Sequence, residues 1–129
     1  SKKKNPNSVV CGYSSISRRE AENVYIPKVV INTNNQLIYM SRSLIPGAKK
    51  NSIKRNFFKQ VCIYAFNKQE LKKFYNFKKK YSKNEMAEDI EILRFLELNI
   101  PIKMVKVSGS SIAVDIKSDI KKVNKKLKK

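Results

Sequence analysis

The chain contains no histidine and no tryptophan among its 129 residues, and it has only two cysteines. Without histidine, neither a Ser–His nor a Cys–His catalytic pair can form within the chain. Cys11 and Cys62 are too far apart in the sequence to give the short ligand spacing of a zinc site. These absences predict a protein that is not an enzyme and that uses no cofactor and no metal.

Glycine and long apolar runs are also scarce. Three scattered glycines cannot build a P-loop or a dinucleotide-binding fingerprint. No apolar stretch approaches the roughly 20 residues of a membrane-spanning helix, and the polar residues 1–7 are not followed by the hydrophobic region of a signal peptide. Because the sequence begins at Ser1 rather than at a methionine, we expect a trimmed or processed chain.

Acidic residues are few, so the charge is strongly unbalanced. There are 10 acids against 29 lysines and arginines, which gives a formal net charge of +19. Such an excess repels itself in a free monomer and favours a polyanionic partner. Nucleic acid is the predicted partner, and an anionic membrane surface is the alternative.

The first half of the chain reads as three strands. Residues 8–16 alternate loosely, and residues 24–31 are β-branched and aromatic, with Pro27 favouring an edge or a bulge. The Asn-rich residues 32–36 predict a turn, and residues 37–40 the returning strand of a hairpin. A loop over residues 41–50 follows, broken at Pro46 and Gly47.

From residue 51 or 52 the spacing predicts a helix, because Ile53, Phe57, Val61 and Ala65 recur at i, i+4. Cys62 falls inside this run and is expected to be a buried free thiol, although a disulfide with Cys11 stays open. Residues 72–81 are ambiguous between helix and strand. A second helix is predicted over residues 85–98, which carry half of the acids, followed by strands at 102–107 and 112–116.

These elements predict one α/β domain over residues 8–116. We expect a mixed β-sheet with two main helices packed on it in layers. Residues 1–7 form a basic N-terminal arm and residues 117–129, seven of them lysine, a basic C-terminal tail. Both arms are expected to be disordered until they bind a polyanion.

The stretch SRSLIPGAKKNSIKRNFFKQ, residues 41–60, resembles the central motif of the universal small-subunit ribosomal protein S-eleven family. In that family a strand ending in W-S-S is followed by A-G-x-x-G-F-K-G-S-R-K-S-T-P-x-A-A-Q. Ser41, Gly47, Lys49 and Gln60 match this motif without a gap. Residues 31–39 are similar to the family's I-T-D-x-x-G-N-x-L hairpin, and residues 88–96 to its R-E-S-A-I-R-A-L segment. The family's G-P-G-x-G-R turn and its T-P-I-P-H-N-G-C-R-P-P-K segment are missing.

The resemblance implies a structural constituent of the ribosome on the platform of the small subunit. Its partners would be small-subunit rRNA, neighbouring ribosomal proteins and mRNA near the exit path, with no membrane. The Lys-, Asn- and Ile-rich composition indicates an AT-rich genome, so we expect a mitochondrial or other organellar ribosome. Cytoplasmic and plastid ribosomes are the alternatives.

Basic and hydroxyl side chains in three segments form the predicted rRNA interface. Cations attract phosphates, hydroxyl and amide groups fix register, glycine permits close backbone approach, and an exposed tyrosine can stack on a base. The predicted rRNA-binding residues are Arg42, Ser43, Gly47, Lys49, Lys50, Asn51, Ser52, Lys54, Arg55, Lys78, Lys79, Lys80, Tyr81, Lys83, Lys121, Lys122, Lys125 and Lys126.

A second hypothesis is a DNA-binding transcription or chromatin regulator. Residues 51–71 weakly resemble the helical BEN domain, in which a basic and apolar helix is followed by a Phe-x-x-x-Glu-Leu pattern, here Phe66 to Leu71. That domain is almost wholly helical, so a β-sheet would argue against it. A third hypothesis, a factor that binds anionic membranes or acts as a chaperone, has no motif in its favour.

Overall fold

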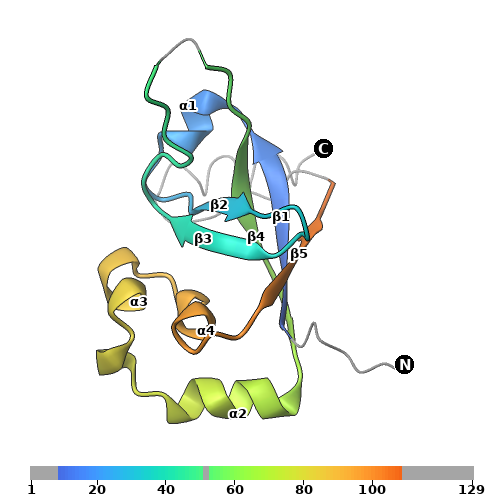
Figure 1. The fold of residues 1–129 in the computed structure, drawn as a ribbon, viewed down its shortest axis with the longest axis vertical. Helices are drawn as coiled ribbons and strands as arrows, with labels where there is room; N and C mark the ends of the chain where they lie inside the picture. The colour runs from blue at the N-terminus through green and yellow to red at the C-terminus, as the bar shows by residue number, and fades with distance from the viewer. Residues whose placement is uncertain (1–8, 51–52, 109–129) are drawn as a thin grey trace, which may run out of the picture.

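A mixed five-stranded β-sheet organises the chain (Figure 1). The computed structural model describes residues 9–50 and 53–108. The strands are β1 (Val9–Ile16), β2 (Lys28–Ile31), β3 (Leu37–Ser41), β4 (Phe57–Phe66) and β5 (Ile102–Lys106). They lie in the order β3-β2-β4-β1-β5, in which β1 and β5 are parallel and the other neighbours are antiparallel.

The sheet is curled, so that its two edge strands approach each other. Gln36, just before β3, forms an antiparallel bridge with Lys103 of β5. The amide of Met104 donates a hydrogen bond to the Asn35 carbonyl at 2.7 Å. Asn35 stands in the left-handed region with φ of 59°, which asparagine tolerates better than most residues. The hairpin turn therefore links both edges of the sheet.

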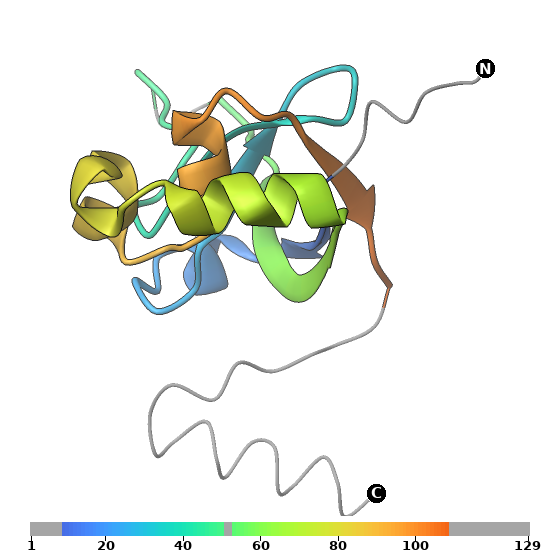
Figure 2. The ribbon, with the colours of Figure 1, turned by 90° about the horizontal axis from the view of Figure 1, so that it is seen from below.

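The helices gather at the two ends of the sheet (Figure 1). α1 (Arg18–Ala21) lies at one end, and its Ser17 N-cap forms a capping box with Glu20. The opposite end is covered by α2 (Lys68–Asn76), the 3₁₀ helix η1 (Lys79–Tyr81), α3 (Lys83–Glu88) and α4 (Leu93–Glu97). Figure 2 shows α2 crossing this end, with α3 and α4 beside it. No helix in the described part of the chain has the length and apolarity needed to cross a membrane.

The hydrophobic core lies between one face of the sheet and α4. Val9 and Cys11 of β1 are paired with Ile102 and Met104 of β5, and all four side chains are buried. Leu93 and Phe95 of α4 pack on the same cluster. Alternation along β1 and β5 places one set of side chains in this core.

An ion pair fastens the helices to one another. The Arg94 guanidinium donates to both carboxylate oxygens of Glu85, each at 2.7 Å, and to the Phe74 carbonyl at 3.2 Å. It also lies 3.9 Å from the centre of the Phe74 ring. Glu85 is 1% exposed and belongs to α3, Arg94 to α4 and Phe74 to α2. One side chain therefore holds three helices.

Several sequence predictions are confirmed. The molecule is an α/β domain with a mixed sheet, the first strand is β1, and the hairpin at residues 28–41 is present. Asn32 closes the turn, since its side-chain oxygen accepts from the amides of Asn34 and Gln36. The strand predicted at 102–107 is β5. The predicted arms at 1–7 and 117–129 and the strand at 112–116 lie outside the described residues.

The helix predicted from residue 51 or 52 is wrong. Residues 57–66 form β4, which pairs with β1 along the whole strand, from Val9 opposite Phe66 to Ile16 opposite Phe57. The spacing that suggested a helix, i and i+4, is also an even step and therefore lies on one face of a strand. Phe57 and Val61 are indeed buried on one side of β4. The nearly helical BEN-like alternative is wrong for the same reason.

Three element boundaries also differ from the prediction. The helix expected over residues 85–98 is two helices, because Asp89 adopts φ of 55° and ends α3. The ambiguous segment 72–81 is the end of α2 followed by η1. The second strand begins at Lys28 rather than at residue 24, so Pro27 precedes it instead of interrupting it.

The Glu85–Arg94 pair gives a stability prediction. We expect Glu85→Gln to lower the free energy of unfolding by about 3 kcal/mol, because it leaves a largely buried guanidinium without its counter-charge. Urea denaturation measures the change. The control is Glu22→Gln, whose pair with Arg18 is more than half exposed on both sides and which we expect to change the same quantity by less than about 0.5 kcal/mol. Equal effects of the two variants would contradict a stabilising role for the buried Glu85–Arg94 ion pair.

Candidate functional site

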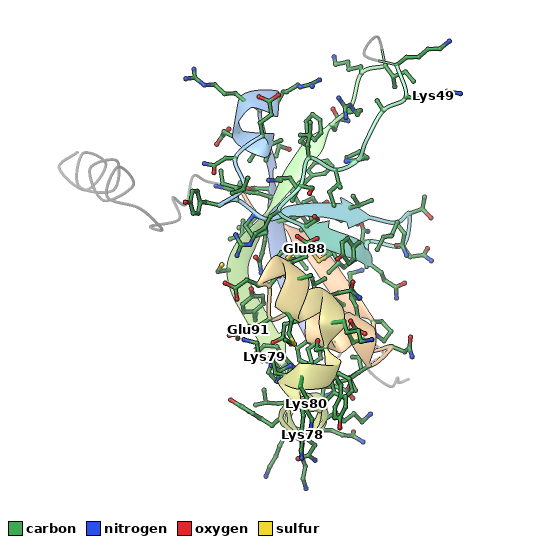
Figure 3. All side chains as sticks on the ribbon, turned by 90° about the vertical axis from the view of Figure 1, so that its left-hand side faces the viewer. Lys49, Lys78, Lys79, Lys80, Glu88 and Glu91 are labelled. Atoms are coloured by element: carbon green, nitrogen blue, oxygen red, sulfur yellow. The ribbon has the colours of Figure 1, made fainter. Side chains whose placement is uncertain are left out.

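The residues predicted to bind rRNA do not form one surface. Figure 3 shows Lys49 at one end of the molecule and Lys78, Lys79 and Lys80 at the other, with Glu88 and Glu91 between them. Tyr81 and Lys83 follow in η1 and α3, at the same end as Lys78, while Ser43, Gly47 and Lys50 belong to the loop after β3. Asn51, Ser52, Lys121, Lys122, Lys125 and Lys126 lie outside the described residues. The described members of the predicted set therefore come from two separate segments of the chain, residues 42–55 and residues 78–83.

Gly47 has no close neighbour that would explain its lack of a side chain. A Cβ atom built on it meets nothing within 4 Å. Among the described residues, the backbone here is thus not in close approach to another segment.

Arg42, the first residue after β3, points back into the protein. Its guanidinium donates to the carbonyls of Glu88, Val24 at 3.1 Å and Asp89 at 2.9 Å. These bonds use three of the five N–H groups of the side chain. All three acceptors are neutral, so the positive charge is positioned by the protein without being neutralised by them. Arg42 is a fixed cation with two N–H groups left for a ligand.

The Glu88 carboxylate holds this arrangement from the helical side. It accepts the Arg42 amide at 3.0 Å and the Tyr39 hydroxyl at 3.2 Å. Burial alone would raise the pKa of Glu88, but hydrogen bonds from Ser41, Arg42 and Tyr39 outweigh it and lower the pKa below 4.5. Glu88 is therefore ionised at neutral pH and ties α3 to the end of β3.

Lys28 adds a second positive charge beside Arg42. It is fully buried at the start of β2, and its ammonium donates to the Asn23 carbonyl at 2.7 Å. Burial lowers its pKa, the neighbouring Arg42 lowers it further, and Glu88 opposes both. Two cations and one carboxylate therefore meet where β2, β3 and α3 join.

Arg42 lies on the wall of a cavity of about 540 Å³ between β4 and the helices. This volume falls within the range of small-molecule sites. The lining residues are Pro27, Arg42, Gln60, Tyr64, Phe66, Leu71, Phe74, Tyr75, Asp89, Ile90, Glu91, Ile92 and Phe95. We call this space the Arg42 cavity.

Aromatic rings form one wall of the Arg42 cavity. Tyr64 and Phe66 are stacked with centroids 5.9 Å apart, and Phe66 and Phe95 with centroids 5.4 Å apart. Phe74 continues the array, 4.9 Å from Phe95. Arg94 belongs to α4 and contacts both the ring and the carbonyl of Phe74. The Glu85–Arg94 ion pair therefore also helps to position this wall.

Polar groups face the same space. The Gln60 amide donates to the hydroxyl of Tyr64, four residues further along β4. Burial, followed by nearby Cys62, Cys11 and Glu91, raises the pKa of Tyr64, so its hydroxyl stays protonated. Asp89 and Glu91, in the link between α3 and α4, add two carboxylates to the cavity lining. A cation, an amide, phenols and carboxylates around aromatic rings suit a polyhydroxylated organic acid.

Cys62 is a free thiol as predicted, but it is neither buried nor in a helix. Cys62 lies exposed on β4, whereas Cys11 is the buried thiol, and both are free. Burial, and to a lesser extent Cys62, raises the pKa of Cys11 to about 12, so it is an inert core residue. The described residues contain no group of three or more His, Cys, Asp or Glu side chains arranged to hold a metal ion.

The sequence prediction found Arg42 but missed the rest of the Arg42 cavity. Gln60, Tyr64 and Phe66 are separated by even steps, and this alternation was available in the sequence. Asp89 and Glu91 belong to the segment that was predicted as one continuous helix over residues 85–98. Only the break at Asp89 brings these two residues to the cavity.

Known proteins were compared with the whole chain. No family model matches it. It is 36% identical over 100 residues to 3-deoxy-manno-octulosonate cytidylyltransferase of Christiangramia forsetii, covering 78% of this chain and 40% of that protein. The protein of the same name in Flavobacterium johnsoniae is 35% identical over 101 residues, with 78% and 41% covered. That of Escherichia coli is 33% identical over 118 residues, with 92% and 46% covered.

A solved structure agrees with these relatives. CMP:2-keto-3-deoxy-manno-octonic acid synthetase complexed with CTP superposes with a TM-score of 0.83 and 31% sequence identity, over 95% of this chain and 49% of that one. This chain is similar to part of a cytidylyltransferase. It spans less than half the length of the curated relatives that it matches.

These findings correct the functional predictions. The resemblance to ribosomal protein S-eleven, the structural role in the ribosome and the rRNA-binding and translation functions are wrong, because the similar proteins are named as cytidylyltransferases. The expectation of a protein that is not an enzyme is wrong for the same reason. The predicted rRNA, mRNA and ribosomal-protein partners and the mitochondrial ribosome are also wrong, since the relatives are bacterial enzymes and the structural neighbour holds CTP. A positive charge excess indicates affinity for anions in general, and the inference to RNA went beyond it.

The Glu88 network predicts a pH dependence. A carboxylate with a lowered pKa stabilises the folded state above its unfolded pKa, here about 4.5, and this contribution is lost as the pH falls through the folded value. We therefore expect the free energy of unfolding to fall between about pH 5 and pH 3. The free energy of unfolding of Glu88→Gln should fall less steeply over the same pH range. Urea denaturation at a series of pH values measures the slope for each protein. An unchanged slope in Glu88→Gln would show that Glu88 does not titrate with folding.

Proposed function

We propose that this chain is part of a cytidylyltransferase that joins the CMP group of CTP to a 3-deoxy-2-keto sugar acid. The observation that carries the proposal is the likeness to the CTP-bound synthetase, with 31% identity and a TM-score of 0.83 over 95% of the chain. The curated relatives, all named for 3-deoxy-manno-octulosonate, support the same substrate class. Because the chain spans less than half of them, it supplies a portion of the machinery in this proposal.

The Arg42 cavity is the proposed place of the sugar acid. A carboxylate matches the fork of a guanidinium, and Arg42 keeps two N–H groups for it while three carbonyls fix its position. The sugar hydroxyls can bond to Gln60 and Tyr64 on one side and to Glu91 on the other. Apolar C–H faces of the sugar pack on the aromatic wall of Phe66 and Phe95.

The reaction proposed is a nucleotidyl transfer. A hydroxyl oxygen of the sugar acid forms a bond to the α-phosphorus of CTP, the bond from that phosphorus to the bridging oxygen breaks, and pyrophosphate leaves. The hydroxyl proton is released to solvent or to a base. In this proposal the described residues position the sugar acid. Holding the acceptor in place raises the rate because it lowers the entropic cost of bringing the two substrates together.

An activity measurement tests the proposal. We expect a protein that contains this chain within its natural sequence to release pyrophosphate when CTP and 3-deoxy-manno-octulosonate are both present, and to form the CMP-linked sugar acid. Replacing CTP by ATP, or omitting the sugar acid, should abolish the product. Release of pyrophosphate that does not depend on the sugar acid would overturn the proposal.

A substitution at Arg42 tests the assigned cavity. We expect Arg42→Lys to weaken binding of 3-deoxy-manno-octulosonate roughly tenfold, because lysine keeps the charge but lacks the planar fork. Isothermal titration gives the dissociation constants. The methyl ester of the sugar acid, which has no carboxylate charge, should lose little affinity in the same variant. The control Arg19→Lys, in exposed α1, should leave both constants unchanged.

Equal losses for the acid and its ester would show that Arg42 supports the cavity wall without contacting the carboxylate. A sugar acid that binds the unaltered protein but is insensitive to Arg42→Lys would place the carboxylate elsewhere.

A further inference from the structure

The end of the molecule formed by α2, η1 and α3 carries many exposed positive charges. Residues 68–83 contain seven lysines and a single acid, Glu70. All seven lysine side chains are exposed, whereas Glu70 is buried and pairs with Lys73 at 3.5 Å. The lysines are Lys68, Lys72, Lys73, Lys78, Lys79, Lys80 and Lys83.

Large aromatic and apolar side chains are exposed among these lysines. Tyr75 of α2, Tyr81 of η1 and Met86 of α3 are 73%, 57% and 55% exposed. One exposed side chain of this kind is ordinary, but three on neighbouring helical segments indicate a contact surface. We call the seven lysines together with these three residues the lysine–tyrosine surface. Only Tyr75 of this set also lines the Arg42 cavity.

Helical spacing places the charged and aromatic groups of α2 on its outer side (Figure 2). Lys68, Lys72 and Tyr75 are four and three residues apart, so they share one face of the helix. The other side holds the half-buried Phe74, whose ring centroid lies 4.9 Å from that of Phe95 in the core. α2 therefore packs on the protein through one side and presents lysine and tyrosine side chains on the other.

The acids of α3 and α4 are engaged within the protein. Glu85 pairs with Arg94, and Glu88 accepts hydrogen bonds from the end of β3. Glu97 accepts the backbone amide of Asn84 at 3.0 Å and its side-chain amide at 2.7 Å. In the described part of the chain, the pair with α2's single acid is the one ion pair that the seven lysines make. Their charge is therefore available to an anionic partner.

We propose that the lysine–tyrosine surface binds the surface of an anionic lipid bilayer. The long lysine side chains can place their ammonium groups beside lipid phosphates, while the tyrosine rings and the methionine enter the boundary between headgroups and hydrocarbon. Negatively charged lipids attract each lysine that is held near the bilayer, and the attractions add up. The inference does not depend on the proposed cytidylyltransferase reaction.

Nucleic acid shares the negative charge of such a bilayer, but it fits these residues less well. Residues 68–93 contain no arginine, whose planar guanidinium forms two-point contacts with phosphate and stacks on bases. The Tyr75 ring packs edge-on against Phe74, with centroids 5.8 Å apart. The Lys80 ammonium lies over the Tyr81 ring, 5.0 Å from its centre, where a base would stack. These contacts favour a diffuse layer of charge over a chain of stacked bases.

Vesicle co-sedimentation tests the partner and the location. We expect the 129-residue chain to bind vesicles of phosphatidylcholine mixed with phosphatidylglycerol, but not vesicles of phosphatidylcholine alone. Lys78→Gln/Lys80→Gln should weaken this binding about tenfold or more, because both ammonium groups are lost from the contact. The control Lys49→Gln/Lys50→Gln removes the same charge at the other end of the molecule (Figure 3) and should change binding less than about twofold.

A fluorescence measurement tests whether the aromatic side chains enter the bilayer. The chain contains no tryptophan, so a single introduced one reports on its own surroundings. We expect the emission of Tyr81→Trp to shift to shorter wavelength when anionic vesicles are added. The control Tyr25→Trp, 48% exposed between α1 and β2, should show no shift. Circular dichroism and thermal melting confirm that all variants are folded.

Equal losses in the two double variants would show that net charge alone attracts the vesicles, and would overturn the proposed surface. Vesicle binding without an emission shift in Tyr81→Trp would do the same. Tighter binding to a single-stranded oligonucleotide than to vesicles of equal phosphate content would assign the surface to nucleic acid. Vesicle binding that is kept in Arg42→Lys but lost in Lys78→Gln/Lys80→Gln would support the proposal even if the sugar acid does not bind.

Discussion

The ion pair between Arg94 and Glu85 is the contact on which the helical half of the molecule depends. The segments around it are short: α3 has six residues and α4 five, too few to be stable as isolated helices. A bidentate bond between a carboxylate that is 1% exposed and a guanidinium that is 12% exposed fixes their relative position. The third contact, to the Phe74 carbonyl, extends the constraint to α2. Two rings of the aromatic wall of the Arg42 cavity, Phe74 and Phe95, belong to α2 and α4 and are therefore positioned by this ion pair.

A second arginine connects this helical unit to the sheet by the same chemistry. Arg42 reaches carbonyls on both sides of the α3 end and one in the segment before β2, while Glu88 receives the Arg42 amide in return. In both places a planar guanidinium donates hydrogen bonds to backbone carbonyls at or near the ends of helices and in loops. The difference lies in the counter-charge. The charge of Arg94 is neutralised by a bidentate carboxylate. The side chain of Arg42 bonds only to neutral carbonyls among the contacts described, so its positive charge can attract the carboxylate of a bound acid.

The sequence predicted the parts of the fold that depend on local chemistry. The Asn-rich turn and its hairpin depend on residues 32–36 alone, and the alternation in residues 102–106 indicates β5 directly. β4 was misassigned because a spacing of four residues fits both a helix and a strand. Its conformation is decided by eight residue pairs with β1, which lies 40 or more residues earlier in the chain. Non-local pairing of this kind overrides a local pattern.

The candidate site was harder to predict than the fold. Arg42 was selected for its charge and does line a cavity, but its role depends on carbonyls at Val24, Glu88 and Asp89 that only the folded chain brings together. The net charge of +19 favoured the lysines as candidate binding residues, and it gave no indication of the polar and aromatic residues of β4. The ribosomal resemblance rested on the spacing of residues in a loop, a hairpin and one later segment, and such spacing does not determine the order of the strands in the sheet. Tertiary structure was needed to distinguish a cation that faces solvent from one that faces a cavity.

The curl of the sheet has a consequence for solubility. A sheet with open edges exposes unpaired backbone groups that can recruit the edge of another molecule, and proteins counter this with charge or cover. Here the turn before β3 bonds to β5 through Gln36, Lys103 and Met104, so the two outer strands partly cover each other. Lys103 and Lys106 place ammonium groups along what is left of the β5 edge. A chain with so small a core is thereby protected from edge-to-edge aggregation while it remains rich in β-structure.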